Sequence, residues 1–282
     1  MNIGVNFFGP KRSLYHDFDG TLERLKQSGL TSAEICVAFA GNGEPPKELN
    51  LQIPEEIIRQ MSGGIWPLEV ASERLAAVRA HGLTVLSCHM MLGFQTGPEQ
   101  LVSLIPKLLD FGKANRISYY VFSPMRDLNG MKTLIPAIKE ISNALAEIGI
   151  TLLLHNHEME CTPVDGITAL DYVLEQCPNL GLELDVGWAK FAGADPVALM
   201  QKYHDRIPLL HFKDVRADAC AANRDTCFTA IGEGSIPLRG IMAAAKDCAI
   251  VEHGLIIDQD DSPTDILEDL ARGAENIRAA AQ

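Results

Sequence analysis

Short apolar runs alternate with longer segments of helical spacing along the whole chain. A continuous apolar run bounded by turn residues is typical of a buried parallel strand, and a period of 3.6 residues is typical of an amphipathic helix. The apolar runs predict eight strands, each followed by a segment with the spacing of an amphipathic helix. The predicted strands are residues 2–8, 32–39, 83–89, 117–122, 150–154, 181–184, 208–210 and 255–259.

The helix boundaries follow from capping residues and breakers. Asp195 and Pro196 give a clear start, an N-cap followed by a proline in the first turn, for a helix ending at Arg206. Asp165 or Thr168 begins another helix, which Pro178 ends. A final helix, capped by Ser262-Pro263, reaches the C-terminus. Further helices are predicted over residues 18–28, 68–81, 98–115, 131–148 and 237–248.

Strict alternation of strands and helices implies parallel strands with helical crossovers. Eight such units, with no composition break to mark a linker, predict one (β/α)8 barrel over residues 1–282. The alternative is an open doubly wound sheet, which is expected to carry a glycine-rich turn after the first strand; Gly9-Pro10-Lys11 is not such a turn. The longest irregular stretch, residues 40–67, predicts a lid-like insertion with a short helix near residues 54–61.

The net charge of the chain makes some classes of binding partner unfavourable. The chain has 37 acidic and 24 basic residues, a net charge of −13. Such a surface repels phosphate backbones and anionic lipid, so we expect neither nucleic acid nor membrane as a partner. Seven cysteines without paired short spacings argue against a disulfide framework. Because the N-terminus resembles a strand rather than a signal peptide, we expect a cytoplasmic protein, and a homo-oligomer stays possible.

Ionisable residues gather at the carboxyl ends of the later strands. The run at 150–154 leads into His155, the run at 181–184 into Asp185, and the run at 208–210 into His211. Strand alternation places these three side chains and Asp258 on faces that can point to one centre. Two imidazoles and two carboxylates form a mixed nitrogen and oxygen donor set, which suits Mn²⁺, Mg²⁺, Co²⁺ or Zn²⁺. We therefore expect His155, Asp185, His211 and Asp258 to bind a divalent metal.

Other polar and aromatic residues are candidates for chemistry or substrate contact. His155, Glu183 and Asp258 are candidate catalytic bases, although a carboxylate inside a barrel, such as Glu183, is also typical of a structural ion pair with the metal cluster or Lys213. For each candidate substrate contact, an ordinary packing or hydrogen-bonding role is the alternative. The candidate substrate contacts are His89, His157, Lys213, Trp66, Trp188 and Glu233.

Over nearly the whole chain, these features resemble the xylose-isomerase-like barrel superfamily, in its sugar phosphate isomerase/epimerase branch. The resemblance implies a divalent metal held by strands five to eight, with Asp185 and His211 at ligand positions. The family's ketose epimerases carry glutamates, which act as acid and base, where this chain has His155 and Asp258. The motifs are His155-Asn-His157, Leu182-Glu-Leu-Asp185-Val-Gly-Trp188, Leu210-His211-Phe-Lys213-Asp214, Gly232-Glu-Gly234 and Asp258-Gln-Asp260.

The resemblance implies an enzyme of carbohydrate metabolism, an isomerase or epimerase that abstracts a proton next to a carbonyl and passes through an enediolate. The alternative is a dehydratase or lyase acting on keto-sugars or 3-keto-glycosides. More distant alternatives are a DNA-repair endonuclease of the same fold and a non-catalytic binding protein. No clear Arg/Lys constellation for phosphate is present, so we expect a small, non-phosphorylated sugar as substrate.

Overall fold

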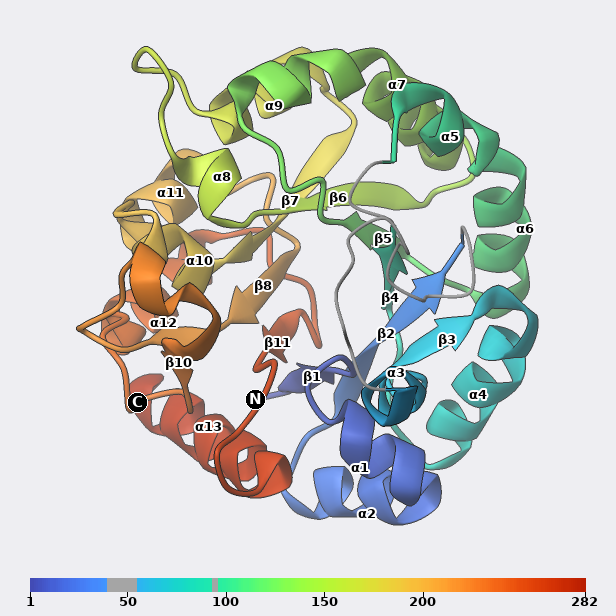
Figure 1. The fold of residues 1–282 in the computed structure, drawn as a ribbon, viewed down its shortest axis with the longest axis vertical. Coiled ribbons are helices and arrows are strands. Elements are labelled where there is room, and N and C mark those ends of the chain that lie inside the picture. Colours follow the sequence, from blue (N-terminus) through green and yellow to red (C-terminus); the bar gives the residue numbers. More distant parts are fainter. Residues whose placement is uncertain (40–54, 93–95) are drawn as a thin grey trace.

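The computed structural model describes residues 1–39, 55–92 and 96–282 of the chain. Parallel strands close into a barrel in the order β1-β11-β8-β7-β6-β5-β4-β2, and β2 pairs with β1 (Figure 1). The predicted (β/α)8 barrel is confirmed. Its strands are β1 (Gly4–Asn6), β2 (Ser32–Ala38), β4 (Ser87–Met91), β5 (Tyr119–Phe122), β6 (Thr151–His155), β7 (Leu180–Asp185), β8 (Leu209–Phe212) and β11 (Leu255–Ile257).

The main helices form a ring around the barrel (Figure 1). They have amphipathic faces that cover the outside of the sheet, and several begin at a side-chain cap. Thr168 caps α9 and Asp195 caps α11, as predicted. The helices are α1 (Lys11–His16), α2 (Phe18–Gln27), α3 (Glu55–Met61), α4 (Leu68–Ala80), α5 (Pro98–Ser103), α6 (Ile105–Asn115), α7 (Leu128–Ala146), α8 (Glu158–Cys161), α9 (Ala169–Gln176), α10 (Val186–Phe191), α11 (Pro196–Lys202), α12 (Leu238–Ala244) and α13 (Ile266–Ala280).

Several predicted boundaries were wrong. The helix expected over residues 98–115 is two helices, because Pro106 at the start of α6 lacks the N–H that a continuous helix needs. The last helix is capped by Asp265 rather than by Ser262-Pro263. The helix that begins at Pro196 ends at Lys202 instead of Arg206. The strand expected over 83–89 is β4, which begins four residues later and ends two residues later than predicted.

The predicted insertion at 40–67 lies partly outside the described residues. Its second half holds the expected short helix, α3, and a short strand, β3 (Ile65–Pro67), which pairs with β2. The polar loop after β8 also holds unpredicted structure. It contains β9 (Asp214–Val215) and β10 (Phe228–Thr229), which form an antiparallel pair.

The core has two layers. A large apolar cluster lies between the sheet and the helices, and a small one fills the inside of the barrel. The inner cluster is Val121, Leu153, Leu209 and Ile256, each buried. Full burial of such a side chain contributes about 1.5–3 kcal/mol. Three of them lie two residues before His155, His211 and Asp258, so strand alternation sends those polar side chains to the same inner face.

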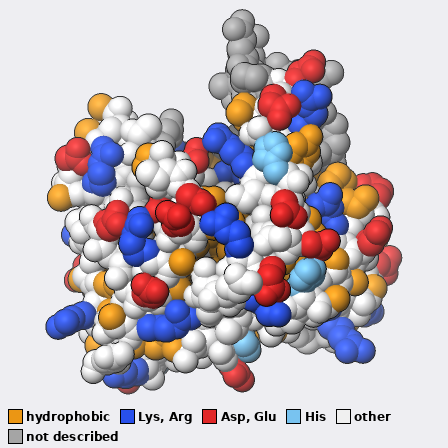
Figure 2. Space-filling model, turned by 90° about the horizontal axis from the view of Figure 1, so that it is seen from below, with side chains coloured by type: hydrophobic (Ala, Val, Ile, Leu, Met, Phe, Trp, Pro, Cys, Tyr) orange, Lys and Arg blue, Asp and Glu red, His pale blue; other side chains and the backbone are white. Residues whose placement is uncertain are grey.

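The molecular surface carries both charge signs. On the face in Figure 2, acidic and basic side chains are interspersed rather than gathered by sign. All seven cysteines are free, as expected. Within the described parts of the chain, no helix has the length and apolar character needed to cross a membrane.

Candidate metal centre

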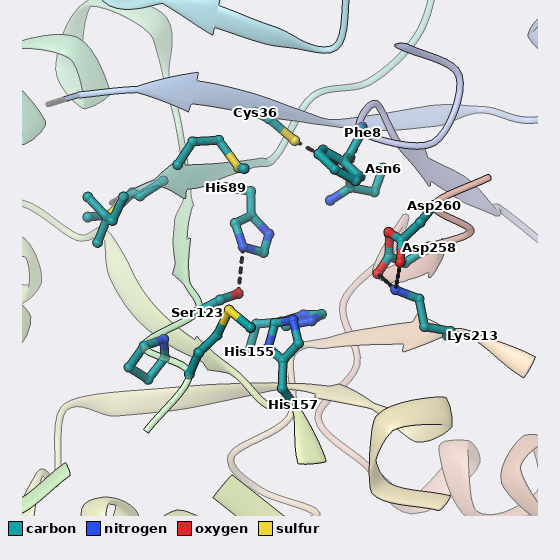
Figure 3. A pocket seen from close by; sticks show the side chains of 15 residues that line it. Asn6, Phe8, Cys36, His89, Ser123, His155, His157, Lys213, Asp258 and Asp260 are labelled. Atoms are coloured by element: carbon teal, nitrogen blue, oxygen red, sulfur yellow. Dashed lines mark hydrogen bonds and ion pairs between the residues drawn. The ribbon is translucent and has the colours of Figure 1, made fainter. Parts of the chain in front are cut away.

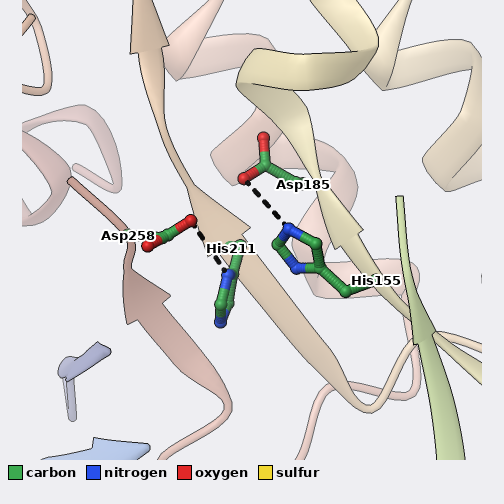
Figure 4. Close-up of side chains that lie close together, drawn as sticks. All are labelled: His155, Asp185, His211 and Asp258. Atoms are coloured by element: carbon green, nitrogen blue, oxygen red, sulfur yellow. Dashed lines mark ion pairs between the residues drawn. The ribbon is translucent and has the colours of Figure 1, made fainter. Parts of the chain in front are cut away.

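Four polar side chains from four neighbouring strands converge at the carboxyl end of the barrel. His155 ends β6, Asp185 ends β7, His211 lies in β8 and Asp258 follows β11. One potential ligand atom from each residue lies within 4.8 Å of the other three (Figure 4). The structure therefore brings together the four residues that the sequence suggested as metal ligands.

The donor atoms of this cluster fit a cation better than they fit one another. Asp185 Oδ2 and His211 Nδ1 are buried without a hydrogen bond from any described residue. Asp185 Oδ2 is 3.9 Å from His155 Nε2, and His211 Nδ1 is 3.6 Å from Asp258 Oδ2. Both distances exceed hydrogen-bond range. Ligands bound at about 2.0–2.2 Å lie roughly 3–4 Å apart, so a divalent cation would satisfy all four residues.

The local charge also favours a cation. Asp185 and Asp258 are buried near the ammonium of Lys213. Glu183 and Glu34 are buried beside the imidazole of His211 and, against burial, raise its pKa well above the usual value. Burial raises the pKa of Asp185 to about 7, which shows how strongly the apolar surroundings oppose its charge. Because an uncompensated buried charge costs several kcal/mol, a bound divalent cation would stabilise these carboxylates in their ionised form.

Asp185 is held rigidly by its surroundings. Its Oδ1 accepts the backbone N–H of Trp188 at 2.7 Å and so caps α10. The amide of Asn156 donates to the carbonyl oxygen of Asp185 at 3.1 Å and accepts its N–H at 3.0 Å. With one carboxylate oxygen and the backbone fixed, the second oxygen is directed to the centre without loss of side-chain freedom on binding.

Two fully buried glutamates lie behind the imidazoles of the cluster. Glu183 is 3.0 Å from His155 Nδ1 and 3.2 Å from His211 Nε2, and Glu34 is 3.2 Å from the same His211 nitrogen. The contact between Glu183 and His155 is a hydrogen bond, whereas the two contacts of His211 Nε2 are ion-pair distances without one. A carboxylate hydrogen-bonded to a metal-binding histidine orients the ring and fixes its tautomer. Of the two partners suggested by the sequence, Glu183 contacts the histidine cluster and not Lys213, which instead contacts Asp258 at 2.8 Å.

The buried ionisable groups of the site differ in the direction in which their pKa values are shifted. Burial and the neighbouring Glu34 raise the pKa of Glu183 well above its usual value. Against the effect of burial, the imidazole of His211 holds the pKa of Glu34 well below its usual range. Burial lowers the pKa of His155, which keeps its ring neutral and suited to metal binding. Against burial, Asp258 and Asp260 raise the pKa of Lys213 and keep it charged.

A pocket with a volume of about 260 Å³ reaches the His155 and Asp258 side of the cluster, whereas Asp185 and His211 do not line it (Figure 3). Among the predicted substrate contacts, His89, His157 and Lys213 line it, together with His155 and Asp258. Glu183 does not line the pocket. The remaining lining is largely apolar: Asn6, Phe8, Cys36, Met90, Met91, Leu92, Ser123, Pro124, Met125 and Asp260.

An aromatic group packs behind His157. The ring of Trp188 is 5.0 Å from the His157 ring and 4.5 Å from the Phe228 ring, measured between centroids. Trp188 is 4% exposed and does not line the pocket itself. Lys213 Nζ lies 5.4 Å from the centroid of the Trp188 ring, so the tryptophan supports two pocket-lining residues.

Three of the residues suggested as substrate contacts do not line the pocket. Trp188 packs behind His157, and the other two, Trp66 and Glu233, lie away from the site. Trp66 is fully buried, packs edge-on against Phe7 and donates to the Gly63 carbonyl at 2.9 Å. Glu233 pairs with Arg272 at 2.9 Å on the surface. The structure corrects both expectations: the first side chain fills the core, and the loop carrying the second turns it outward.

Several residues of the site were not predicted from the sequence. Glu34 had a visible signal, an acidic residue within the otherwise apolar strand β2. Asn156 and Ser123 had no such signal in the sequence, because their contacts depend on neighbouring strands that are distant in sequence. Ser123 Oγ lies 2.8 Å from His89 Nε2, and Glu34 Oε1 lies 3.2 Å from His89 Nδ1.

The fold and this cluster define the class of protein. Residues 22–280 match the family described as xylose isomerase-like TIM barrel, and the chain belongs to that family. Among curated proteins, the inosose dehydratase of Geobacillus kaustophilus is 36% identical over 89 residues, which is 31% of this chain and 28% of that protein. Other curated relatives have the same name, and the chain spans less than half of their length.

Solved structures show the same architecture along the whole chain. A protein from Parabacteroides distasonis described as a sugar phosphate isomerase/epimerase has a TM-score of 0.72 at 19% identity, covering 100% of this chain and 95% of its own. The IOLI protein, whose structure has a bound zinc atom, has a TM-score of 0.71 at 13% identity, covering 100% and 98%. At such identities the likeness shows the fold alone.

Proposed function

We propose that this protein is a divalent-metal-dependent lyase that removes water from a polyhydroxylated ketone of the inosose type. The observation that carries the proposal is the buried cluster of His155, Asp185, His211 and Asp258, two members of which, His155 and Asp258, line a pocket of about 260 Å³. The relatives named inosose dehydratase support this substrate class. His89, His157 and Lys213 are the proposed substrate contacts.

The ligand set favours elimination over epimerisation. Related ketose epimerases carry glutamates where this chain has His155 and Asp258, and those glutamates serve as acid and base. His155 Nδ1, on the side of the ring away from the centre, is 3.0 Å from Glu183. Asp258 Oδ2, the oxygen that lies 3.6 Å from His211 Nδ1, is also 2.8 Å from the charged Lys213, so neither residue is a free base. They are therefore suited to holding a metal rather than to a two-base proton exchange.

The chain's own residues bind and orient the substrate in this proposal. A divalent cation held by His155, Asp185, His211 and Asp258 would polarise the substrate carbonyl and acidify the adjacent C–H bond. Lys213 has three N–H donors and is 2.8 Å from both Asp258 and Asp260, so its third donor is available to a substrate oxygen. His157 offers its buried Nδ1, which has no hydrogen bond from the described residues, to a substrate hydroxyl.

Reconstitution tests the proposal directly. The purified protein is stripped of metal, reloaded separately with Mn²⁺, Co²⁺, Mg²⁺ and Zn²⁺, and incubated with inososes and keto-sugars. We expect loss of one water from an inosose, detected by mass spectrometry, and none with the Asp185→Asn variant. A metal-loaded protein that leaves every such ketone unchanged would contradict the proposal.

A sugar epimerase or isomerase is the second candidate. Ionisable groups lie on two sides of the pocket, His89 on one and Asp260 on the other, as epimerisation requires (Figure 3). The first step, removal of a proton beside the carbonyl, is the same in both reactions. Interconversion of ketones without release of water, in the same reconstitution, would favour this second function.

A further inference from the structure

The proposed dehydration needs a group that takes a proton from carbon and returns it to the departing hydroxyl. The proposed metal ligands His155 and Asp258 are engaged by the centre, and Glu183 lies behind them without reaching the pocket. Lys213 is charged and therefore cannot accept a proton. Of the other ionisable groups that line the pocket, Asp260 pairs with Lys213 at 2.8 Å. His157 and His89 are left, and His89, in β4, lies beside Ser123, which follows β5 (Figure 3).

His89 connects this side of the pocket to a buried carboxylate. Its Nδ1 is 3.2 Å from Glu34 Oε1, and its Nε2 is 2.8 Å from the Ser123 hydroxyl. Asn6 donates to the same Glu34 oxygen at 2.7 Å and holds the carboxylate in place. His89 and Ser123 both line the pocket, whereas Glu34 is fully buried.

The order of the three groups fixes the tautomer of His89. An ionised carboxylate only accepts hydrogen bonds, so the proton between His89 and Glu34 belongs to Nδ1. Nε2 therefore has a lone pair, which accepts the Ser123 hydroxyl. A hydroxyl, a neutral imidazole and a buried carboxylate in this order are arranged for proton transfer at the hydroxyl end.

We propose that Ser123, His89 and Glu34 form a proton relay in which His89 is first the base and then the acid of the dehydration; this inference rests on the proposed function. His89 Nε2 takes the proton beside the substrate carbonyl, and the electron pair of the broken C–H bond stays on the substrate. The C–O bond to the departing hydroxyl then breaks. That oxygen takes the Ser123 proton, Ser123 takes the Nε2 proton, and one water leaves.

His157 provides the contrast within the same pocket. It also lines the pocket, but its Nδ1 has no hydrogen bond from the described residues, whereas the Nδ1 of His89 is 3.2 Å from Glu34. An imidazolium formed at His89 would lie 3.2 Å from Glu34 Oε1, whereas the described residues place no hydrogen-bond partner at His157 Nδ1. This hydrogen-bond geometry assigns the relay to His89.

A change of leaving group tests the relay. Fluoride departs without a proton, so an inosose with fluorine in place of the departing hydroxyl does not need Ser123. We expect Ser123→Ala to lower kcat for water loss by about 10²-fold, the usual contribution of a positioned acid, with little effect on fluoride release. Ser123→Thr restores the hydroxyl and the rate. Ser87→Ala, another buried serine near the start of β4, is the matched control and leaves both rates unchanged.

Equal slowing of both leaving groups in Ser123→Ala, or no slowing of either, would overturn the relay. A second measurement does not depend on turnover. In the Zn²⁺-loaded protein, ¹⁵N chemical shifts should show the Nδ1–H tautomer of His89, and Glu34→Gln should abolish that preference. An Nε2–H tautomer would overturn the relay even if the protein dehydrates inososes. Absence of dehydration with the expected tautomer would instead reject the proposed function alone.

Discussion

Glu183 is a residue whose role depends on its surroundings in three dimensions. In the sequence it is a carboxylate two positions before Asp185, suited either to catalysis or to an ion pair. In the structure it is fully buried and lies within 3.2 Å of both imidazoles of the candidate centre. Glu183 does not line the pocket, so we propose that it orients the histidines rather than contacting the substrate.

The substitution Glu183→Gln separates these two roles. We expect metal affinity to fall about 10–100-fold, because an amide orients His155 and His211 less well than a carboxylate. Competition with a fluorescent chelator measures the affinity, and Glu147→Gln, at an exposed position, is the control. Unchanged affinity with loss of turnover at saturating metal would identify Glu183 as the base instead.

At the scale of elements, the loop after β8 is built around one carboxylate. Asp214 accepts the N–H groups of Gly232 at 2.8 Å, Gly234 at 3.0 Å and Ile236 at 3.1 Å. Gly232 has a φ of +93°, a conformation that favours glycine. The Gly-Glu-Gly motif therefore serves loop geometry, which explains why Glu233 does not enter the pocket.

Gly234→Ala tests this reading of the motif. A Cβ at Gly234 would lie 2.1 Å from Asp214 Oδ1 and 2.6 Å from the Val215 carbonyl oxygen, so the loop must shift. We expect a loss of about 1–3 kcal/mol in unfolding free energy, the usual cost of overpacking, measured by denaturant titration. Gly240→Ala is the control, because its nearest neighbour would be 3.4 Å away and alanine favours the helix α12. Equal effects of the two substitutions would contradict the argument.

At the scale of the whole molecule, barrel closure brings distant residues together. Glu34 in β2 and His211 in β8 are far apart in sequence, yet they contact each other across the barrel. The inner apolar cluster fills the barrel interior, which leaves the carboxyl end to the polar groups. A divalent cation bound to the carboxylates there would stabilise their buried charges, so we expect metal binding to raise the stability of the fold.

Thermal unfolding measures this linkage. At a free metal concentration 100 times the dissociation constant, binding to the folded state adds about 2.7 kcal/mol. We expect Tm to rise by several degrees on addition of Mn²⁺ or Zn²⁺ and to fall back with a chelator. Asp185→Asn should remove the metal dependence while the circular dichroism spectrum stays that of a folded barrel. A Tm independent of metal would argue against a centre at this position.

The strand–helix order, the barrel and the inward faces of the last strands followed from the sequence. Apolar runs and strand alternation are local properties, so they predicted that His155, Asp185, His211 and Asp258 could point to one centre. Capping residues such as Asp195 were predicted for the same reason, because a cap acts within a few residues. Helix ends without a strong signal, such as that at Lys202, were placed less well.

Only the tertiary structure decided which polar residues share the site. Trp66 and Trp188 look alike in sequence, but the first fills the core and the second supports His157. The contacts of Glu34 with His89 and His211 require strands that meet only when the barrel closes. Local patterns determine elements and faces, whereas partners across the barrel depend on strand register, which no short segment specifies.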